Sequence, residues 1–309
     1  MKRSRARRAR AFALSFGVSL VILSLIFIPI MLKISPLKES YFTTSSKPQS
    51  EAPLSYIPST NDVMTALVIV TEDGVGRYFI LVRFNPINRR IPVSSLPYTM
   101  RVITSERTDT LAGFDIYGGT LMVKEILESV FKITIDRTAR LSSDSFVKAL
   151  NTLGTVKYTL PYSLVHKDTS SDTYINVPKG TQMLDGRSIY DMFRFPQYAE
   201  GEEHRYKVQS DLIAKLLNQH IDSWLVKHGD SVFQTLVGLG ETDISYNDYQ
   251  QRRSALRSFA EMEDDFAIPI FVSGQFTSQG FSITQQSVDT IHMYFAPEDE
   301  TVSEEAGSE

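Results

Sequence analysis

Histidine and cysteine, the residue types that most often bind metals or act as nucleophiles, form no chemical motif in this chain of 309 residues. Cysteine is absent, which excludes a disulfide framework and a thiolate metal site. The histidines are scattered and show no HExxH or other metal-ligand spacing: His166, His204, His220, His228 and His292. We expect them to be ordinary surface or core residues, and we assign no catalytic residue and no metal ligand on this basis.

A clearer pattern lies in residues 180–195, GTQMLDGRSIYDMFRF. Ile189, Met192 and Phe193 recur at helical spacing, and Asp185 stands directly before them. An aspartate at the start of a helix accepts backbone N–H bonds, and the glycine that follows supplies conformational freedom. We interpret Asp185 as a helix cap, and the alternative is a catalytic acid.

The elements that would position this segment alternate between strands and helices. Strands are predicted at residues 64–70, 77–84, 91–95, 131–141, 156–160, 174–177, 268–272 and 291–295. Helices are predicted at residues 120–130, 143–153 and 208–225, after Asp185, and from about Ser245. Helices interleaved with strands predict an α/β protein, with a three-layer α/β/α arrangement around a central mixed sheet.

The N-terminal residues predict a membrane anchor ahead of that domain. Six basic residues stand within residues 1–10, and residues 11–32 carry no ionisable side chain. A helix of about 20 residues crosses the bilayer core, and the Lys/Arg cluster favours a cytoplasmic N-terminus. The alternative, a cleaved signal peptide, needs a shorter apolar core and a small-x-small cleavage site, which the sequence lacks. We therefore expect a single-pass protein of the plasma membrane.

The rest of the chain divides by composition. Residues 33–62 are rich in Ser, Thr and Pro and predict a flexible stalk, residues 63–296 an extracytoplasmic domain, and residues 297–309 a disordered acidic tail. Residues 33–309 hold all 36 acidic residues and all but six of the 32 basic ones, a formal net charge of about −10. This charge argues against a nucleic-acid partner but leaves room for a local basic pocket.

The order of these features resembles the LytR–CpsA–Psr family of bacterial cell-envelope proteins. Lys179, Gly180, Leu184–Gly186 and Arg194 fit the family pattern Lys-Gly-x-x-x-Leu-Asp-Gly followed by a helix that ends in Arg. Further segments resemble family motifs in the same order: Asn85–Pro86, Ser95–Pro97, Tyr117–Gly119, Leu153–Val156, Arg205–Gln209 and Thr242–Ser245. The similarity covers residues 64–295.

The resemblance implies an α/β/α domain that binds a polyprenyl-pyrophosphate-linked glycan and transfers the glycan phosphate to peptidoglycan. It implies arginines that hold the pyrophosphate, acidic residues that bind Mg²⁺ and an apolar pocket for the lipid tail. The planar guanidinium fork suits phosphate oxygens. The candidate pyrophosphate ligands are Arg194, Arg205, Arg77 and Lys207. The candidate lipid-pocket residues are Phe193, Phe195, Met192, Leu212 and Leu216. Alternatively, Arg194 is an ordinary helix-end cation, Lys207 lies on a solvated face, and the apolar residues are plain core.

The sequence departs from the family pattern where the pattern supplies charge. Arg77 stands where the family has a metal-binding Asp, and Tyr98–Thr99 stand where it has Arg-Asp. Loss of two carboxylates should weaken Mg²⁺ binding, because a hard cation needs oxygen ligands. The acids that could substitute are Glu72, Asp73, Glu202 and Glu203, and the spacing singles out none of them. Two functions follow: a glycopolymer phosphotransferase of cell-wall biogenesis, or a catalytically impaired member that acts as a lipid-pyrophosphate-binding or scaffold protein.

Overall fold

The computed structural model describes residues 56–168 and 173–297. The predicted basic tail (1–10), the predicted transmembrane anchor (11–32), residues 33–55 of the predicted stalk and residues 298–309 of the predicted acidic tail lie outside the described residues. Within the described ranges, no helix combines the length and the apolar character needed to cross a bilayer.

A six-stranded mixed sheet forms the centre of the domain, in the order β11-β6-β1-β2-β3-β12. The strands are β1 (Met64–Glu72), β2 (Val75–Phe84), β3 (Ile91–Leu96), β6 (Arg137–Ser142), β11 (Glu241–Thr242) and β12 (Ala267–Pro269). Strand β2 is antiparallel to both β1 and β3, whereas β6 runs parallel to β1 and β12 parallel to β3. The predicted central mixed sheet is therefore confirmed.

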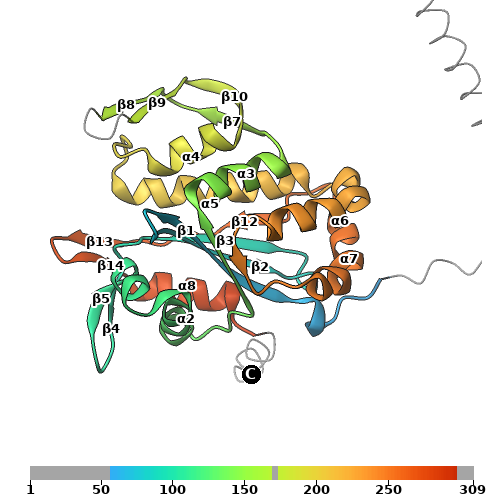
Figure 1. Cartoon of the computed structure of the whole chain (residues 1–309), viewed down its shortest axis with the longest axis horizontal. Helices are drawn as coiled ribbons and strands as arrows, with labels where there is room; N and C mark the ends of the chain where they lie inside the picture. Colours follow the sequence, from blue (N-terminus) through green and yellow to red (C-terminus); the bar gives the residue numbers. More distant parts are fainter. Residues whose placement is uncertain (1–55, 169–172, 298–309) are drawn as a thin grey trace, which may run out of the picture. The chain divides into compact units, whose positions relative to one another are not determined.

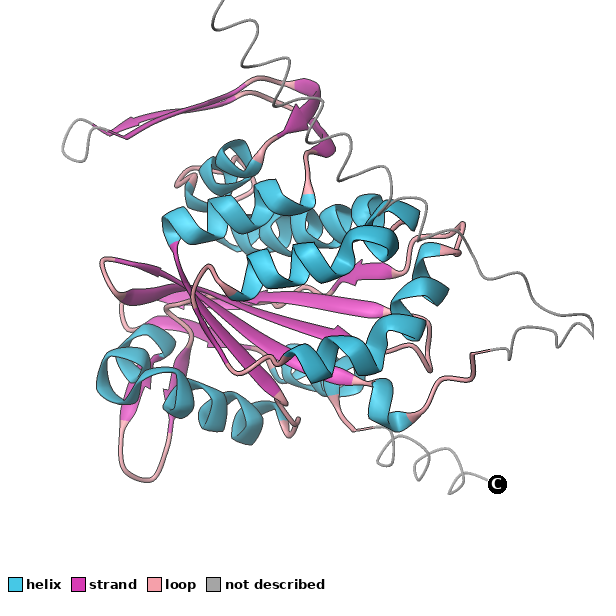
Figure 2. Cartoon of the chain, turned by 45° about the vertical axis from the view of Figure 1, so that its right-hand side comes forward, coloured by secondary structure: helices cyan, strands magenta, loops and turns pink. Residues whose placement is uncertain are grey.

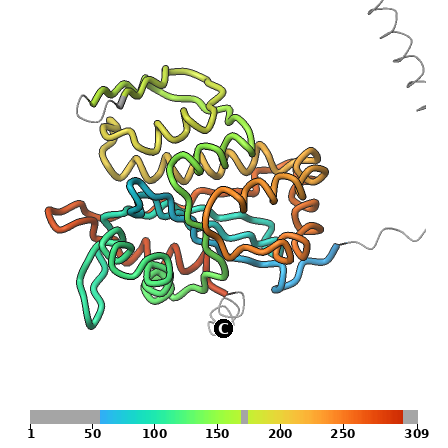
Figure 3. The backbone as a smooth tube through the Cα atoms, viewed as in Figure 1, coloured from blue at the N-terminus to red at the C-terminus, as the bar shows by residue number. Residues whose placement is uncertain are grey.

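Helices cover both faces of this sheet (Figure 1). On one face lie α3 (Ser143–Leu153), α4 (Gly186–Arg194), α5 (Glu202–His220) and α6 (Ser223–Val237), and α7 (Tyr246–Ala260) packs beside α6. On the other face lie α2 (Leu111–Phe131) and α8 (Gln285–Phe295). Figure 3 shows that α2 and α8 lie side by side although they are far apart in the chain.

Each face has its own apolar core because alternate residues of a strand point to opposite sides. Leu67 and Ile69 of β1 pack with Phe131 and Phe295 on the side of α2 and α8. Val70 lies in the opposite core, with residues of α3 to α6. A strand buried on both faces reads as a continuous apolar run, which is why Met64–Val70 could be predicted from the sequence.

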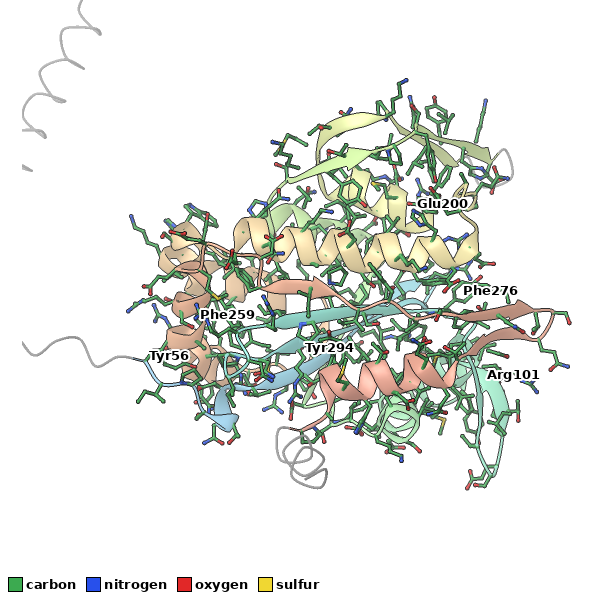
Figure 4. All side chains as sticks on the ribbon, turned by 180° about the vertical axis from the view of Figure 1, so that it is seen from behind. Tyr56, Arg101, Glu200, Phe259, Phe276 and Tyr294 are labelled. Atoms are coloured by element: carbon green, nitrogen blue, oxygen red, sulfur yellow. The ribbon has the colours of Figure 1, made fainter. Side chains whose placement is uncertain are left out.

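Smaller two-stranded sheets lie outside the central sheet (Figure 2). They are β4 (Arg101–Ile103) with β5 (Thr108–Thr110), β7 (Val156–Leu160) with β10 (Gly180–Leu184), β8 (Leu164–Asp168) with β9 (Thr173–Val177), and β13 (Gly274–Thr277) with β14 (Gly280–Ile283). Figure 4 labels Phe276 of β13 and Glu200 at the same end of the domain, opposite Tyr56 and Phe259.

The predicted strand at residues 291–295 is wrong, since these residues close helix α8. Thr284 caps this helix by accepting a hydrogen bond from the backbone N–H of Ser287. Ile291 and Phe295 are fully buried, one helical turn apart. These five residues looked like a strand because the cap that begins the helix lies seven residues upstream of Ile291.

Other boundaries also differ from the sequence prediction: the helix predicted over residues 120–130 begins at Leu111, and the strand predicted over residues 268–272 ends at Pro269. The helix predicted over residues 208–225 ends at His220, and a second helix begins after Asp222, which accepts a hydrogen bond from Leu225 N. The strand predicted over residues 131–141 begins only at Arg137, because Phe131 still belongs to α2. Local N-capping by Asp222 therefore divides a pattern that is amphipathic throughout.

Residues 56–62, the last part of the predicted stalk, contact the domain. Thr60–Asp62 form the 3₁₀ helix η1, and Arg252 of α7 donates hydrogen bonds to the backbone carbonyls of residues 61–63. Tyr56 donates to the buried carboxylate of Asp62 at 2.9 Å. These contacts fix the point at which the chain enters β1.

Candidate functional site: an arginine-lined cavity

Four elements end or begin around one cavity of about 460 Å³, which we call the arginine cavity. Glu72 ends β1, Arg77 lies at the start of β2, Arg194 ends α4 and Arg205 lies in the first turns of α5. The full lining is Glu72, Asp73, Arg77, Tyr78, Tyr98, Ser143, His166, Asp168, Ile175, Tyr190, Phe193, Arg194, Pro196, Arg205, Tyr206 and Gln209. Guanidinium groups that are 128 residues apart in the chain therefore share one space.

The Asp-Gly turn before α4 has a structural role. Asp185 accepts a hydrogen bond from Ser188 N at 2.8 Å, and this bond lowers the pKa of its carboxyl. Gly186 lies against α3, where an added Cβ would be 2.4 Å from the carbonyl oxygen of Val147. Asp185 does not line the arginine cavity. The interpretation of Asp185 as a helix cap is confirmed, and the cap starts the helix that ends at Arg194.

Arg77 lies between an aromatic ring and a carboxylate. Its guanidinium carbon is 3.7 Å from the ring centroid of Tyr98, and its Nε is 3.6 Å from Glu72 Oε2. Glu72 Oε1 accepts hydrogen bonds from the hydroxyls of Tyr78 at 2.9 Å and Tyr190 at 2.6 Å. Burial raises the pKa of both tyrosines, so they remain donors at neutral pH.

Arg194 is oriented by its own helix. Its Nε and Nη2 donate to Asp191 Oδ1 at 3.0 and 2.7 Å, and its guanidinium carbon lies 5.6 Å from the ring centroid of Tyr190. Its side chain is mostly buried, at 18% exposure. Arg194 is therefore both a helix-end cation and a residue that lines the arginine cavity.

Arg205 and Tyr206 carry buried polar atoms that lack a protein partner. Arg205 Nη2 donates to the carbonyl of Pro196 at 3.1 Å, and Nη1 is 3.9 Å from Glu202 Oε1. Among the described residues, neither Arg205 Nε nor the Tyr206 hydroxyl has a hydrogen-bond partner, although both are buried. Burial raises the pKa of Tyr206, so its hydroxyl is a donor as well. Buried polar atoms without a partner are uncommon, and both of these donors belong to residues that line the arginine cavity.

Gln209 links the elements around the cavity. Its side chain accepts a hydrogen bond from Ser95 Oγ at 2.5 Å and donates to the carbonyl of Phe193 at 2.9 Å. Ser95 N in turn donates to Ser210 Oγ at 2.9 Å. These buried bonds join the end of β3, the end of α4 and the middle of α5, so Gln209 holds the arginines of two helices at a fixed separation.

Lys207 does not share the arginine cavity with the predicted arginines. Its side chain is 41% exposed and its Nζ lies 4.0 Å from Glu203 Oε1 on the same helix. The lining of the arginine cavity does not include it. The structure therefore places Lys207 on the solvated face of α5, which was the alternative interpretation of this residue.

The candidate lipid-pocket residues do not lie together around one cavity. Phe193 lines the arginine cavity, whereas Leu216 lines a separate apolar groove of about 290 Å³ between the sheet and helices α3, α5 and α6. Phe195, Met192 and Leu212 line neither of these two and are buried core residues. Val68 and Val82, on the central strands β1 and β2, line the groove and are only partly buried. Sequence spacing could not reveal this groove, because its walls come from three helices and four strands.

Comparison with known proteins identifies the family to which this chain belongs. The LytR_cpsA_psr family model matches residues 77–301, which is most of the chain. This chain belongs to the LytR_cpsA_psr family. The resemblance inferred from the sequence motifs is thus confirmed, and the family match begins at Arg77, the first arginine of the cavity.

Relatives of the LytR_cpsA_psr protein are distant in sequence. An uncharacterized protein of Staphylococcus aureus (strain NCTC 8325 / PS 47) is 23% identical over 231 residues, which are 69% of this chain and 57% of the relative. The chain therefore spans little more than half of that relative's length.

Solved structures share the fold. A protein from Eubacterium siraeum named as a transcription regulator has a TM-score of 0.71 at 15% identity, over 83% of this chain and 98% of its own. Bacillus subtilis TagV has a TM-score of 0.61 at 18% identity, over 75% and 95%. TagT bound to LIIa-WTA has a TM-score of 0.58 at 17% identity, over 82% and 98%. At these identities the likeness establishes the fold of the domain.

Proposed function

We propose that this protein is a membrane-anchored, extracytoplasmic member of the family that acts in cell-wall biogenesis by binding a polyprenyl-pyrophosphate-linked glycan. The observation that carries the proposal is the convergence of Arg77, Arg194 and Arg205 on one cavity. A pyrophosphate concentrates negative charge, and guanidinium forks match its oxygens in geometry and sign. Arg205 and Tyr206, whose buried donors have no partner among the described residues, line the same cavity.

The apolar groove supports a lipid tail on the same ligand. It lies on the same face of the sheet as the arginine cavity. Phe146 of α3 lines the groove, and Phe193 of α4, which belongs to the same apolar core, lines the cavity. The ring centroids of Phe146 and Phe193 are 5.4 Å apart, so the two hollows are separated by one layer of side chains. Burial of apolar surface would add binding free energy of about 25 cal/mol per Å².

The relatives favour a cell-wall glycopolymer as the cargo. Family membership and the fold shared with TagT, whose solved structure contains LIIa-WTA, support a polyprenyl-linked glycan as the partner. We extend this to a plasma-membrane location, with the N-terminus in the cytoplasm and the domain outside, because the donor lipid lies in the outer leaflet. Peptidoglycan is the proposed acceptor.

The chemistry of transfer would be a displacement at phosphorus. An acceptor hydroxyl oxygen bonds to the phosphorus on the glycan side, the phosphoanhydride bond breaks, and polyprenyl phosphate leaves while the hydroxyl proton passes to a base or to water. Negative charge grows on the leaving phosphate, and fixed guanidinium groups stabilise it. We assign no catalytic residue to this step.

A second candidate function is binding without turnover. Arg77 stands where the family pattern has a metal-binding carboxylate, so the protein could hold a lipid pyrophosphate as a scaffold and leave transfer to another protein. The two candidates predict the same binding and different chemistry.

The test uses the full-length protein in detergent micelles. It is incubated with a polyprenyl-pyrophosphate-linked glycan and peptidoglycan, and both bound lipid and glycan transferred to the wall are quantified. Binding with transfer supports the transferase, and binding without transfer supports the scaffold. If the protein neither binds the lipid nor transfers the glycan, the proposed function is wrong.

A further inference from the structure

The two positions at which this chain departs from the charged family motifs contact each other. Arg77 replaces a carboxylate and Tyr98 replaces an arginine, and the guanidinium carbon of Arg77 lies 3.7 Å from the ring centroid of Tyr98. A guanidinium stacked on an aromatic face is held in one orientation without using its N–H donors. The two replacements therefore act together: the ring of Tyr98 orients the guanidinium of Arg77, which places a positive charge where the family pattern has an acid.

Glu72 acts as the counter-ion of Arg77. One of its oxygens, Oε1, accepts hydrogen bonds from two tyrosine hydroxyls, and the other, Oε2, lies 3.6 Å from Arg77 Nε. The two tyrosine hydroxyls fill the acceptor positions of Oε1, and the charge of Arg77 beside Oε2 repels a metal ion.

The donor set of the cavity does not fit Mg²⁺. This ion requires near-octahedral oxygen coordination and is usually held by one or two carboxylates. Three carboxylates line the cavity, and among the described residues Glu72, Asp73 and Asp168 do not form a group that could hold a metal ion. In residues 56–168 and 173–297, no group of three or more His, Cys, Asp or Glu side chains is arranged to hold a metal ion.

We propose that the arginine cavity binds the diphosphate group of its ligand without a divalent cation, and that Arg77 supplies the positive charge at that position. This inference rests on the proposed function, since it concerns how the same ligand is held. It assigns Arg77 a specificity role, as a residue that makes the free diphosphate rather than its Mg²⁺ complex the bound form.

The expected behaviour follows from the charges. Mg²⁺ neutralises two negative charges of a diphosphate, so a site of fixed guanidinium groups attracts the metal complex less than the free anion. Affinity should therefore be at least as high in EDTA as in excess Mg²⁺. A site that relies on a bridging metal ion would show the opposite order.

The test titrates farnesyl diphosphate into the full-length protein in micelles by calorimetry, once with excess EDTA and once with excess Mg²⁺. Wild type should bind in EDTA at least as tightly as in Mg²⁺, and Arg77→Gln should lose about tenfold or more in EDTA, the cost of a charge-assisted hydrogen bond of about 1.4 kcal/mol. Arg77→Asp, which restores an acid beside Glu72, should bind weakly in EDTA and recover in Mg²⁺.

Arg107→Gln is the matched control, because Arg107 also lies over a tyrosine ring, at 4.8 Å from Tyr117, and pairs with Asp109. Its side chain is 43% exposed, close to the 42% of Arg77, but it does not line the arginine cavity. This variant should bind like wild type.

The possible failures are distinguishable. Wild-type binding that requires Mg²⁺ overturns this inference and leaves the proposed function standing. Unchanged binding by a folded Arg77→Gln protein also overturns it. Absence of binding under both conditions overturns the inference and the proposed function together.

Discussion

The carboxylate of Asp115 joins the turn before Arg77 to strand β6 through Arg140. Asp115 Oδ2 accepts a hydrogen bond from Gly76 N at 2.7 Å, and Oδ1 lies 2.6 Å from Arg140 Nη1. Arg140 Nη2 also donates to the carbonyl of Gly74 at 2.8 Å. The Asp115 side chain is 1% exposed, so this pair fixes the left-handed turn at Asp73 and Gly74 from within the protein.

Removal of either partner should leave a buried charge without compensation. We expect Asp115→Ala to lower the free energy of unfolding by about 3–5 kcal/mol, measured by urea denaturation. Lys124→Ala is the control, since Lys124 lies 3.9 Å from Glu128 on the surface and should cost at most about 1 kcal/mol. A loss from Asp115→Ala no larger than the control's would contradict this role.

Asp248 should make the free energy of unfolding of the protein depend on pH in the acidic range. Hydrogen bonds from Arg137 hold the pKa of its carboxyl well below the unfolded value of 3.8. A group whose folded pKa is lowered stabilises the protein above its unfolded pKa, and this contribution is lost as the pH falls below 3.8 toward the folded pKa.

The measurement compares urea unfolding at neutral pH and near pH 3. Wild type should lose stability on acidification, and Asp248→Asn should be less stable at neutral pH and lose less on acidification. Asp264→Asn, at an exposed position, should behave like wild type. An Asp248→Asn protein with the full wild-type acid dependence would rule out this assignment.

The cap at Asp185 should matter for stability more than for ligand binding. Asp185→Ala should cost about 1 kcal/mol, and Asp185→Asn much less, because asparagine also caps helices well. Both variants should bind farnesyl diphosphate as wild type does, since Asp185 lies outside the arginine cavity. If Asp185→Asn abolishes binding or transfer while unfolding is unchanged, Asp185 takes part in the chemistry.

The apolar groove offers a way to separate the lipid tail from the diphosphate. Ala149 of α3 lines the groove, and Ala149→Trp should fill it at a stability cost of about 1–3 kcal/mol. Binding of a long polyprenyl diphosphate should weaken by about tenfold or more, or 1.4 kcal/mol, while inorganic diphosphate binds as before. Ala149→Ser serves as the control. Equal effects on both ligands would show that the groove does not hold the tail.

Local sequence signals predicted the fold well where each signal lies within its own element. The apolar run of β1, the cap and glycine stop around α3, and the Asp-Gly start of α4 each specify structure over a few residues. The prediction failed at residues 291–295, where Thr284 begins a helix whose two buried apolar residues, Ile291 and Phe295, fit a strand equally well.

The site was predictable in part for the same reason. Motif resemblance named Arg77, Arg194 and Arg205, and the structure brings all three to one cavity. The sequence did not reveal which aromatic ring and which carboxylate pair with these arginines. The contacts of Arg77 with Tyr98 and of Glu72 with Tyr190 depend on how β1, β2, α4 and the segment after β3 meet. Of the predicted lipid-pocket residues only Leu216 lines the apolar groove, since each segment of the chain contributes only a few of the groove's lining residues.

The most direct test of the account is the affinity of the full-length protein for a polyprenyl diphosphate, compared with that of the Arg194→Gln/Arg205→Gln double variant. The account predicts clear binding by wild type and a loss of about a hundredfold, roughly 2.7 kcal/mol, in a folded double variant, with Arg107→Gln unchanged. Equal affinity in all three proteins, or no binding by wild type, would contradict it.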